Sequence, residues 1–149
     1  MAKIFCIANQ KGGVGKTTTT VNLAAGLAKL GQRVLLVDLD PQGNATMGSG
    51  IDKRQLELSV YDVLLESASI AEAAVDGGQC GYKVLGANRE LAGAEVELVQ
   101  LERRDQRLKT ALAVVDADYD FVLIDCPPSL SMLTLNGLCA AHGVIVPMQ

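Results

Sequence analysis

The feature that most limits what this chain can fold into is a glycine-rich loop between an apolar run and a helical pattern. The loop reads KGGVGKTT at residues 11–18, after apolar residues at 3–8 and before helical spacing at 17–30. Glycines let consecutive backbone N–H groups turn toward one anion. The N-terminus of the following helix adds partial positive charge. In this context the sequence predicts a phosphate-binding P-loop.

The loop predicts a part for each residue in binding a nucleoside triphosphate with Mg²⁺. Lys16 is expected to reach the β- and γ-phosphates, Thr17 to offer its hydroxyl to the metal, and Thr18 to contact the α-phosphate. A glycine-rich turn with solvated lysines is the alternative, and the combination of strand, glycines, lysine and threonines disfavours it. The predicted nucleotide-binding residues are Gly12, Gly13, Val14, Gly15, Lys16, Thr17 and Thr18.

Two aspartates follow apolar runs that read as buried strands. Residues 34–37 lead into Asp38, and residues 121–124 lead into Asp125. In an open α/β sheet, ligands bind at the carboxyl ends of the strands, so both carboxylates should lie beside the P-loop. Asp125 is the predicted Mg²⁺ ligand, and Asp38 is expected to support the metal or Lys16. The alternative for each aspartate is a turn former at a strand end.

Asp40 lies past the strand end, directly before Pro41. Its position in a loop, nearer the expected γ-phosphate, makes it the candidate that positions or activates the attacking water.

Apolar runs alternate with helical patterns along the whole chain. Strands are expected at residues 3–8, 33–38, 82–86, 121–125 and 143–147. Helices are expected at 17–30, 60–66, 70–75, 90–102, 108–115 and 130–141, with Ser59 and Ser69 as caps and a loop at 41–50. This order predicts a doubly wound α/β fold with a mainly parallel sheet, the three-layer Rossmann-like arrangement of P-loop NTPases. We interpret residues 1–149 as one nucleotide-binding domain that continues past Gln149, because no covering helix follows the last strand.

Net charge, the lack of targeting segments and the cysteine pattern indicate where such a protein would act. A net charge of −4 argues against a dedicated nucleic-acid-binding module, which is usually basic. Neither a signal peptide nor an apolar stretch of about 20 residues is present, so a cytoplasmic protein without a membrane anchor is expected. The four cysteines form no CxxC pair, and Cys6 and Cys126 lie in or beside apolar strands. We expect them to be buried reduced thiols.

The loop departs from the standard pattern in one way that indicates a family. Gln10 stands where the first glycine is usual, and an extra lysine, Lys11, precedes the glycine pair. This KGGVGKT form resembles the deviant Walker A motif of the ParA/MinD superfamily. The segments VDLDPQGNAT (37–46), GANRELAGAEVEL (86–98) and IDCPPSLSMLTLN (124–136) resemble the ParA/Soj family of DNA-partition proteins. MinD-type division regulators and iron–sulfur relatives fit these segments less well.

The resemblance implies a slow ATPase switch that uses ATP and Mg²⁺. It implies a homodimer with nucleotide at the interface, in which Lys11 reaches the partner's phosphates and joins Lys16 and Asp40 as catalytic residues. It further implies a cytoplasmic, nucleoid-associated protein that binds DNA non-specifically through residues beyond Gln149, and a ParB-like centromere-binding partner that stimulates hydrolysis. A nucleotide-gated interaction module without turnover and an inactive domain fragment are the alternatives for this chain.

Overall fold

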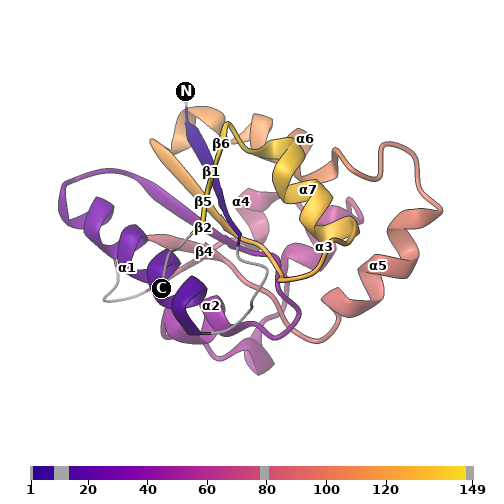
Figure 1. Ribbon diagram of the computed structural model, residues 1–149, viewed down its shortest axis with the longest axis horizontal. Coiled ribbons are helices and arrows are strands. Elements are labelled where there is room, and N and C mark those ends of the chain that lie inside the picture. Colours follow the sequence, from indigo (N-terminus) through magenta and orange to yellow (C-terminus); the bar gives the residue numbers. More distant parts are fainter. Residues whose placement is uncertain (1, 9–13, 78–80, 147–149) are drawn as a thin grey trace.

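A computed structural model describes residues 2–8, 14–77 and 81–146 and shows a six-stranded sheet. The strands lie in the order β3-β4-β2-β5-β1-β6 (Figure 1). Every neighbouring pair is parallel except β3 and β4. The predicted doubly wound, mainly parallel sheet is therefore confirmed. The strands are β1 (Lys3–Ile7), β2 (Val34–Asp38), β3 (Val75–Asp76), β4 (Lys83–Leu85), β5 (Phe121–Asp125) and β6 (Gly143–Ile145).

Helices cover both faces of the sheet. Each parallel strand after the first is reached by a crossover that contains helix, as parallel pairing requires. The helices are α1 (Val14–Lys29), α2 (Asn44–Gly48), α3 (Val60–Leu64), α4 (Ile70–Ala73), α5 (Leu91–Val99), α6 (Arg107–Val114) and α7 (Met132–Ala140). Short 3₁₀ turns occur at Lys53–Gln55 and Asp116–Asp118.

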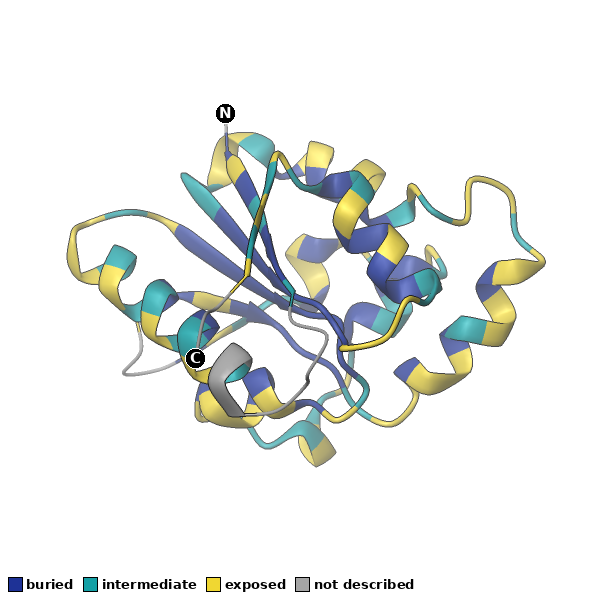
Figure 2. Ribbon diagram, viewed as in Figure 1, coloured by how far each residue is buried: buried dark blue, intermediate teal, exposed yellow. Residues whose placement is uncertain are grey.

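The two faces of the sheet belong to two separate apolar clusters. Along β2, Leu35 and Val37 pack in the cluster under α3, α5, α6 and α7, whereas Val34 and Leu36 pack on the side of α1 and α2. This alternation follows from the two-residue period of a strand. Figure 1 shows the same division, with α1 on one side of the strands and α5 and α7 on the other. In Figure 2 the central strands form the buried interior and the exposed positions lie on the outer faces of the helices.

Both serine caps that the sequence predicts are present. The Ser59 hydroxyl accepts a hydrogen bond from the backbone N–H of Tyr61, and the Ser69 hydroxyl accepts one from Glu72. Each serine N–H is in turn bonded by a carboxylate three residues on, which completes a capping box. These caps fix the starts of two helices that are otherwise too short to be stable alone.

Three local expectations are wrong. Residues 44–48, expected as loop, form α2. The short antiparallel strand β3 was not expected; it replaces the end of the helix predicted at 70–75. Helices predicted at 60–66, 90–102 and 130–141 are shorter at one or both ends. The flanking residues Leu65, Leu101 and Ala141 pack against the core from outside these helices, so an apolar side chain at helical spacing did not mark the helix end.

The expectation of reduced thiols is also wrong for two of the four cysteines. Cys6 and Cys126 are joined in a disulfide and are completely buried. They are 120 residues apart in sequence. The parallel pairing of β1 with β5 places them together, since Cys6 lies opposite Ile124, two residues before Cys126. Cys139, on α7, is a free thiol.

Candidate nucleotide site at the carboxyl edge of the sheet

The carboxyl ends of three strands meet at one edge of the sheet. Asp38 and Asp125, the last residues of β2 and β5, lie directly opposite each other in the parallel register. On the other side of Asp125 lies Ile7, the last residue of β1. Both carboxylates are fully buried. The structure therefore brings together the two strand-end aspartates and the strand that leads into the glycine-rich loop.

The glycine-rich loop is described in part. Lys11, Gly12 and Gly13 lie outside the described residues. Helix α1 begins at Val14, so Gly15 and Lys16 belong to its first turn, although their side chains are outside the described part. The first turn of α1 contains no acidic residue that would oppose an anion there.

A pocket of about 340 Å³ opens between these elements. Thr17 of α1 is half-buried and lines it, whereas Thr18 is exposed. Asp40 lines it from the loop after β2, and residues 127–129 line it from the segment after β5. The full lining is Thr17, Asp40, Pro41, Gln42, Asn44, Pro127, Pro128 and Ser129. Three segments far apart in sequence thus share one hollow, at the edge where α/β sheets bind ligands.

Asp40 is held at the pocket wall by its own loop. The residue is only 8% exposed, and its Oδ1 accepts a hydrogen bond of 3.0 Å from the backbone N–H of Gln42. Its carbonyl accepts a second bond from the N–H of Gly43. The bond from Gln42 orients the carboxylate, and the contacts described for this side chain include no cation.

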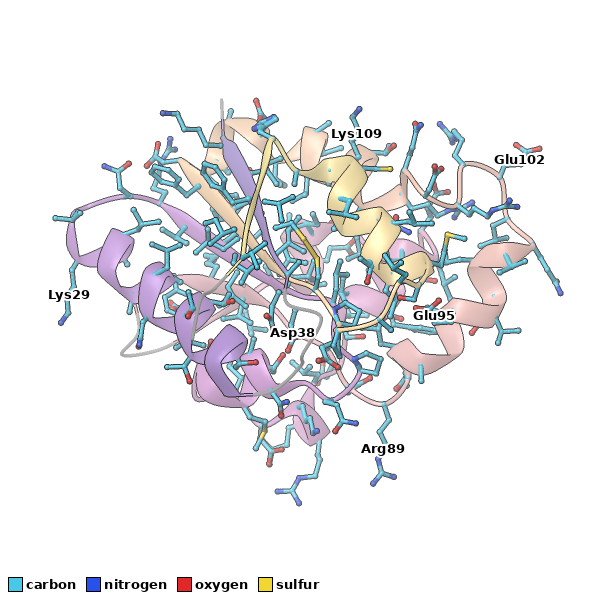
Figure 3. All side chains as sticks on the ribbon, viewed as in Figure 1. Lys29, Asp38, Arg89, Glu95, Glu102 and Lys109 are labelled. Atoms are coloured by element: carbon cyan, nitrogen blue, oxygen red, sulfur yellow. A yellow bond between two sulfur atoms is a disulfide. The ribbon has the colours of Figure 1, made fainter. Side chains whose placement is uncertain are left out.

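Asp38 uses both carboxylate oxygens within the protein. Oδ1 accepts from the backbone N–H of Asp40 at 3.0 Å, and Oδ2 accepts from the N–H and the hydroxyl of Thr46 at 2.9 and 2.7 Å. Burial, followed by the neighbouring Asp125 carboxylate, raises the pKa of Asp38 to about 7, although the bonds from Thr46 and Asp40 act in the opposite direction. Figure 3 shows Asp38 in the interior, below the strand ends. The described hydrogen bonds of Asp38 are with Asp40 and Thr46, and its support of the metal or Lys16 stays a prediction.

A residue that the sequence reasoning missed holds Asp125. The hydroxyl of Thr20, buried on α1, lies 3.3 Å from Oδ1 of Asp125 and donates to it. Thr20 comes three residues after Thr17 and four after Lys16, so all three share one face of the helix. That spacing was available in the sequence and could have identified Thr20.

The segment after Asp125 is anchored by residues from α5 and α7. Glu95 of α5 accepts hydrogen bonds from the backbone N–H groups of Met132 and Leu133, at 2.9 and 3.2 Å, and so caps α7 from a neighbouring helix (Figure 3). Ser131 caps the same helix through Thr134. Residues 127–129 of the pocket wall therefore precede a helix start that is held from two directions.

The oxygen donors at this edge fit Mg²⁺ better than a softer metal. Mg²⁺ binds through one or two protein oxygens and completes its shell with water and substrate phosphates. Thr17 and Asp125 carry oxygens of this kind, and Asp38 lies opposite Asp125 on the adjacent strand. Within residues 2–8, 14–77 and 81–146, no group of three or more His, Cys, Asp or Glu side chains is placed to hold a metal ion without such a substrate.

A family model described as an AAA domain matches residues 2–149. The sporulation initiation inhibitor protein Soj of Bacillus subtilis is 53% identical over 149 residues, which are 100% of this chain and 59% of that protein. The chromosome partitioning protein ParA of Caulobacter vibrioides is 50% identical, over 99% of this chain and 56% of that protein. A crystal structure named cobyrinic acid a,c-diamide synthase from Mycobacterium smegmatis, with bound ATP analogue and magnesium, superposes with a TM-score of 0.96 at 51% identity. The match covers 99% of this chain and 60% of that one.

The chain thus spans less than two thirds of the length of these relatives. Among the described residues, no helix has the length and apolar character that crossing a membrane requires.

Proposed function

Because this chain belongs to the AAA domain family, in its ParA/Soj branch, we propose that it is the nucleotide-binding part of a Mg·ATP-dependent switch for partitioning DNA. The observation that carries the proposal is the meeting of Thr17, Asp40 and residues 127–129 around one pocket, beside the paired Asp38 and Asp125. The names of Soj and ParA support partition. The structure named cobyrinic acid a,c-diamide synthase holds an ATP analogue and magnesium, which supports nucleotide binding.

The proposed roles follow from position. Backbone amides of Gly12, Gly13, Val14 and Gly15 cradle the phosphates, with Lys16 on the β- and γ-phosphates and Thr18 toward the α-phosphate. Thr17 and Asp125 hold Mg²⁺, which neutralises phosphate charge when bound, and Asp38 supports them from behind. Thr20 keeps Asp125 directed at this shell.

Hydrolysis requires a directed water and neutralisation of the developing charge. Asp40, fixed at the pocket wall, orients the attacking water. We place Lys11 on the phosphates of a second copy across an ATP-bound homodimer, where its positive charge acts as an arginine finger does. Turnover is slow until a partner completes this arrangement. The proposed partners are non-specific DNA and a ParB-like centromere-binding protein, in the cytoplasm.

Replacement of Asp40 tests the hydrolytic role. Asp40→Ala should retain Mg·ATP binding and lose steady-state phosphate release, because the phosphate and metal contacts lie on other residues. The control is Asp118→Ala, which replaces an exposed aspartate near the start of β5, at the end of the strand away from Asp125. Phosphate release is measured with and without DNA and a ParB-like protein. Equal turnover in Asp40→Ala and the parent would remove Asp40 from the mechanism. A parent that binds ATP but never releases phosphate would instead indicate a nucleotide-gated module or an inactive fragment.

A further inference from the structure

Thr46 connects two parts of the chain that are distant in sequence, the end of β2 and the residues that follow β4. Its hydroxyl donates to Oδ2 of Asp38 at 2.7 Å and accepts from the backbone N–H of Ala87 at 3.0 Å. Thr46 is completely buried, as are Asp38 and Ala87. One hydroxyl of α2 therefore bridges the end of β2 to the loop after β4, donating one hydrogen bond and accepting another.

The bridge leads directly to Asp40. The carboxylate of Asp38 accepts from Thr46 with Oδ2 and from the N–H of Asp40 with Oδ1. A displacement of Thr46 therefore moves the carboxylate that fixes the backbone of Asp40. Thr46 itself is not among the residues that line the pocket. Its influence on a bound nucleotide must pass through Asp38 and Asp40.

The loop after β4 also closely approaches the backbone of residues 39–43, which we call the Asp40 loop. Gly43 has φ +67°, and a β-carbon added there would lie 2.8 Å from the carbonyl oxygen of Ala87. Only glycine fits this approach, because a side chain would meet backbone that cannot rotate away. The residues after β4 thus support the Asp40 loop from a distant part of the sequence, since Ala87 is 41 positions from Thr46.

We propose that Thr46 is the positioning residue that seats the Asp40 loop, through its bridge from Asp38 to the backbone of Ala87. The proposal rests on the function proposed above, in which Asp40 orients the attacking water. Loss of the hydroxyl leaves the buried N–H of Ala87 without its acceptor and Asp38 without one donor, so the loop shifts to satisfy them. A displacement of about 1 Å in a positioning group can lower turnover about 100-fold.

Two substitutions of Thr46 distinguish the effect of losing the hydroxyl from the effect of changing the side-chain volume. Thr46→Val replaces the hydroxyl by a methyl group of similar size, and Thr46→Ser keeps the hydroxyl. We expect Thr46→Val to lower kcat about 10- to 100-fold while ATP affinity stays within about threefold. Thr46→Ser should retain most of the parent turnover. Phosphate release gives kcat, fluorescent ATP titration gives affinity, and thermal melting shows that each variant is folded.

A double-mutant cycle with Asp40 distinguishes positioning from general stability. If Thr46 acts through Asp40, Thr46→Val should leave the residual single-turnover rate of Asp40→Ala, followed over hours at high enzyme concentration, unchanged within about twofold. Should Thr46→Val not fold, Gly43→Ala disturbs the same contact with the backbone of Ala87 and should give the same loss of kcat with retained affinity. Parent-like kcat in Thr46→Val, an equal loss in Thr46→Ser, or a parallel loss of affinity would each overturn the proposal. A parent without ATP turnover would instead overturn the proposed function itself.

Discussion

At the scale of single residues, the site is built on two buried acids in adjacent strands. Asp38 and Asp125 lie side by side, yet their hydrogen bonds differ. Asp38 accepts three internal bonds from Asp40 and Thr46, whereas Thr20 donates to Asp125. One acid thus organises the loop, and the other lies toward the helix that follows the glycine-rich loop. We interpret this as a division between positioning and metal binding.

The raised pKa of Asp38 predicts a dependence of stability on pH. In the folded chain its pKa is about 7, against an ordinary value of 3.8. The folded state therefore keeps a proton that the unfolded state has released, so the contribution of Asp38 to stability falls as pH rises from about 4 to about 7 and is level above that. Titration of Asp38 changes the free energy of unfolding by at most about 1.4 kcal/mol per pH unit.

Asp38→Asn tests this dependence because an amide does not titrate. Denaturant unfolding is measured between pH 5 and 8 without nucleotide or metal. The variant should gain stability relative to the parent as pH rises toward 7. Asp118→Asn, which replaces an exposed carboxyl group, is the control. A difference between Asp38→Asn and the parent that stays constant with pH would contradict the assignment.

At the scale of elements, α7 lies in direct contact with the strand that carries Asp125. The contact is made at Gly137, where an added β-carbon would lie 2.7 Å from Sγ of Cys126, directly after β5, and 3.4 Å from Cγ2 of Ile124 within β5. The absence of a side chain at this position lets the helix approach β5 closely. The close approach also places the start of α7, with its cap from Glu95, beside the pocket wall.

A matched pair of glycine substitutions tests this packing. Gly137→Ala should lower the free energy of unfolding by about 1–3 kcal/mol, because the added methyl group forces α7 away from β5. Gly26→Ala, inside α1, has nothing within 4 Å of the new β-carbon and should be neutral or stabilising by up to about 1 kcal/mol. Denaturant unfolding of both variants checks the pair. Equal effects at the two positions would show that Gly137 is not a packing contact.

Which elements could be predicted depended on where their stability comes from. The strand ending at Asp125 and the caps at Ser59 and Ser69 were predictable, because apolar runs and capping residues act locally. Helix α2 was not predictable from its Gly- and Asn-containing sequence. Its third N–H, that of Thr46, is capped by Asp38, and that contact exists only after the loop has folded back on β2.

At the scale of the whole molecule, the site depends on parallel pairing of strands that are distant in sequence. The pairing of β2 with β5 joins Asp38 to Asp125, and that of β1 with β5 joins Cys6 to Cys126. The edge rule for α/β sheets predicted the meeting of the aspartates. No comparable rule indicates which cysteines pair, or that Thr46 contacts Ala87, because these depend on register and loop packing.

The central claim is that this edge of the sheet binds Mg·ATP through the glycine-rich loop and the strand-end acids. Equilibrium titration of ATP, with Mg²⁺ and with excess chelator, tests it most directly in the parent, Lys16→Ala and Lys29→Ala. Lys29, exposed in the last turn of α1, is the matched control. The account predicts Mg²⁺-dependent binding by the parent and Lys29→Ala, and none by folded Lys16→Ala. ATP affinity that survives Lys16→Ala would contradict it.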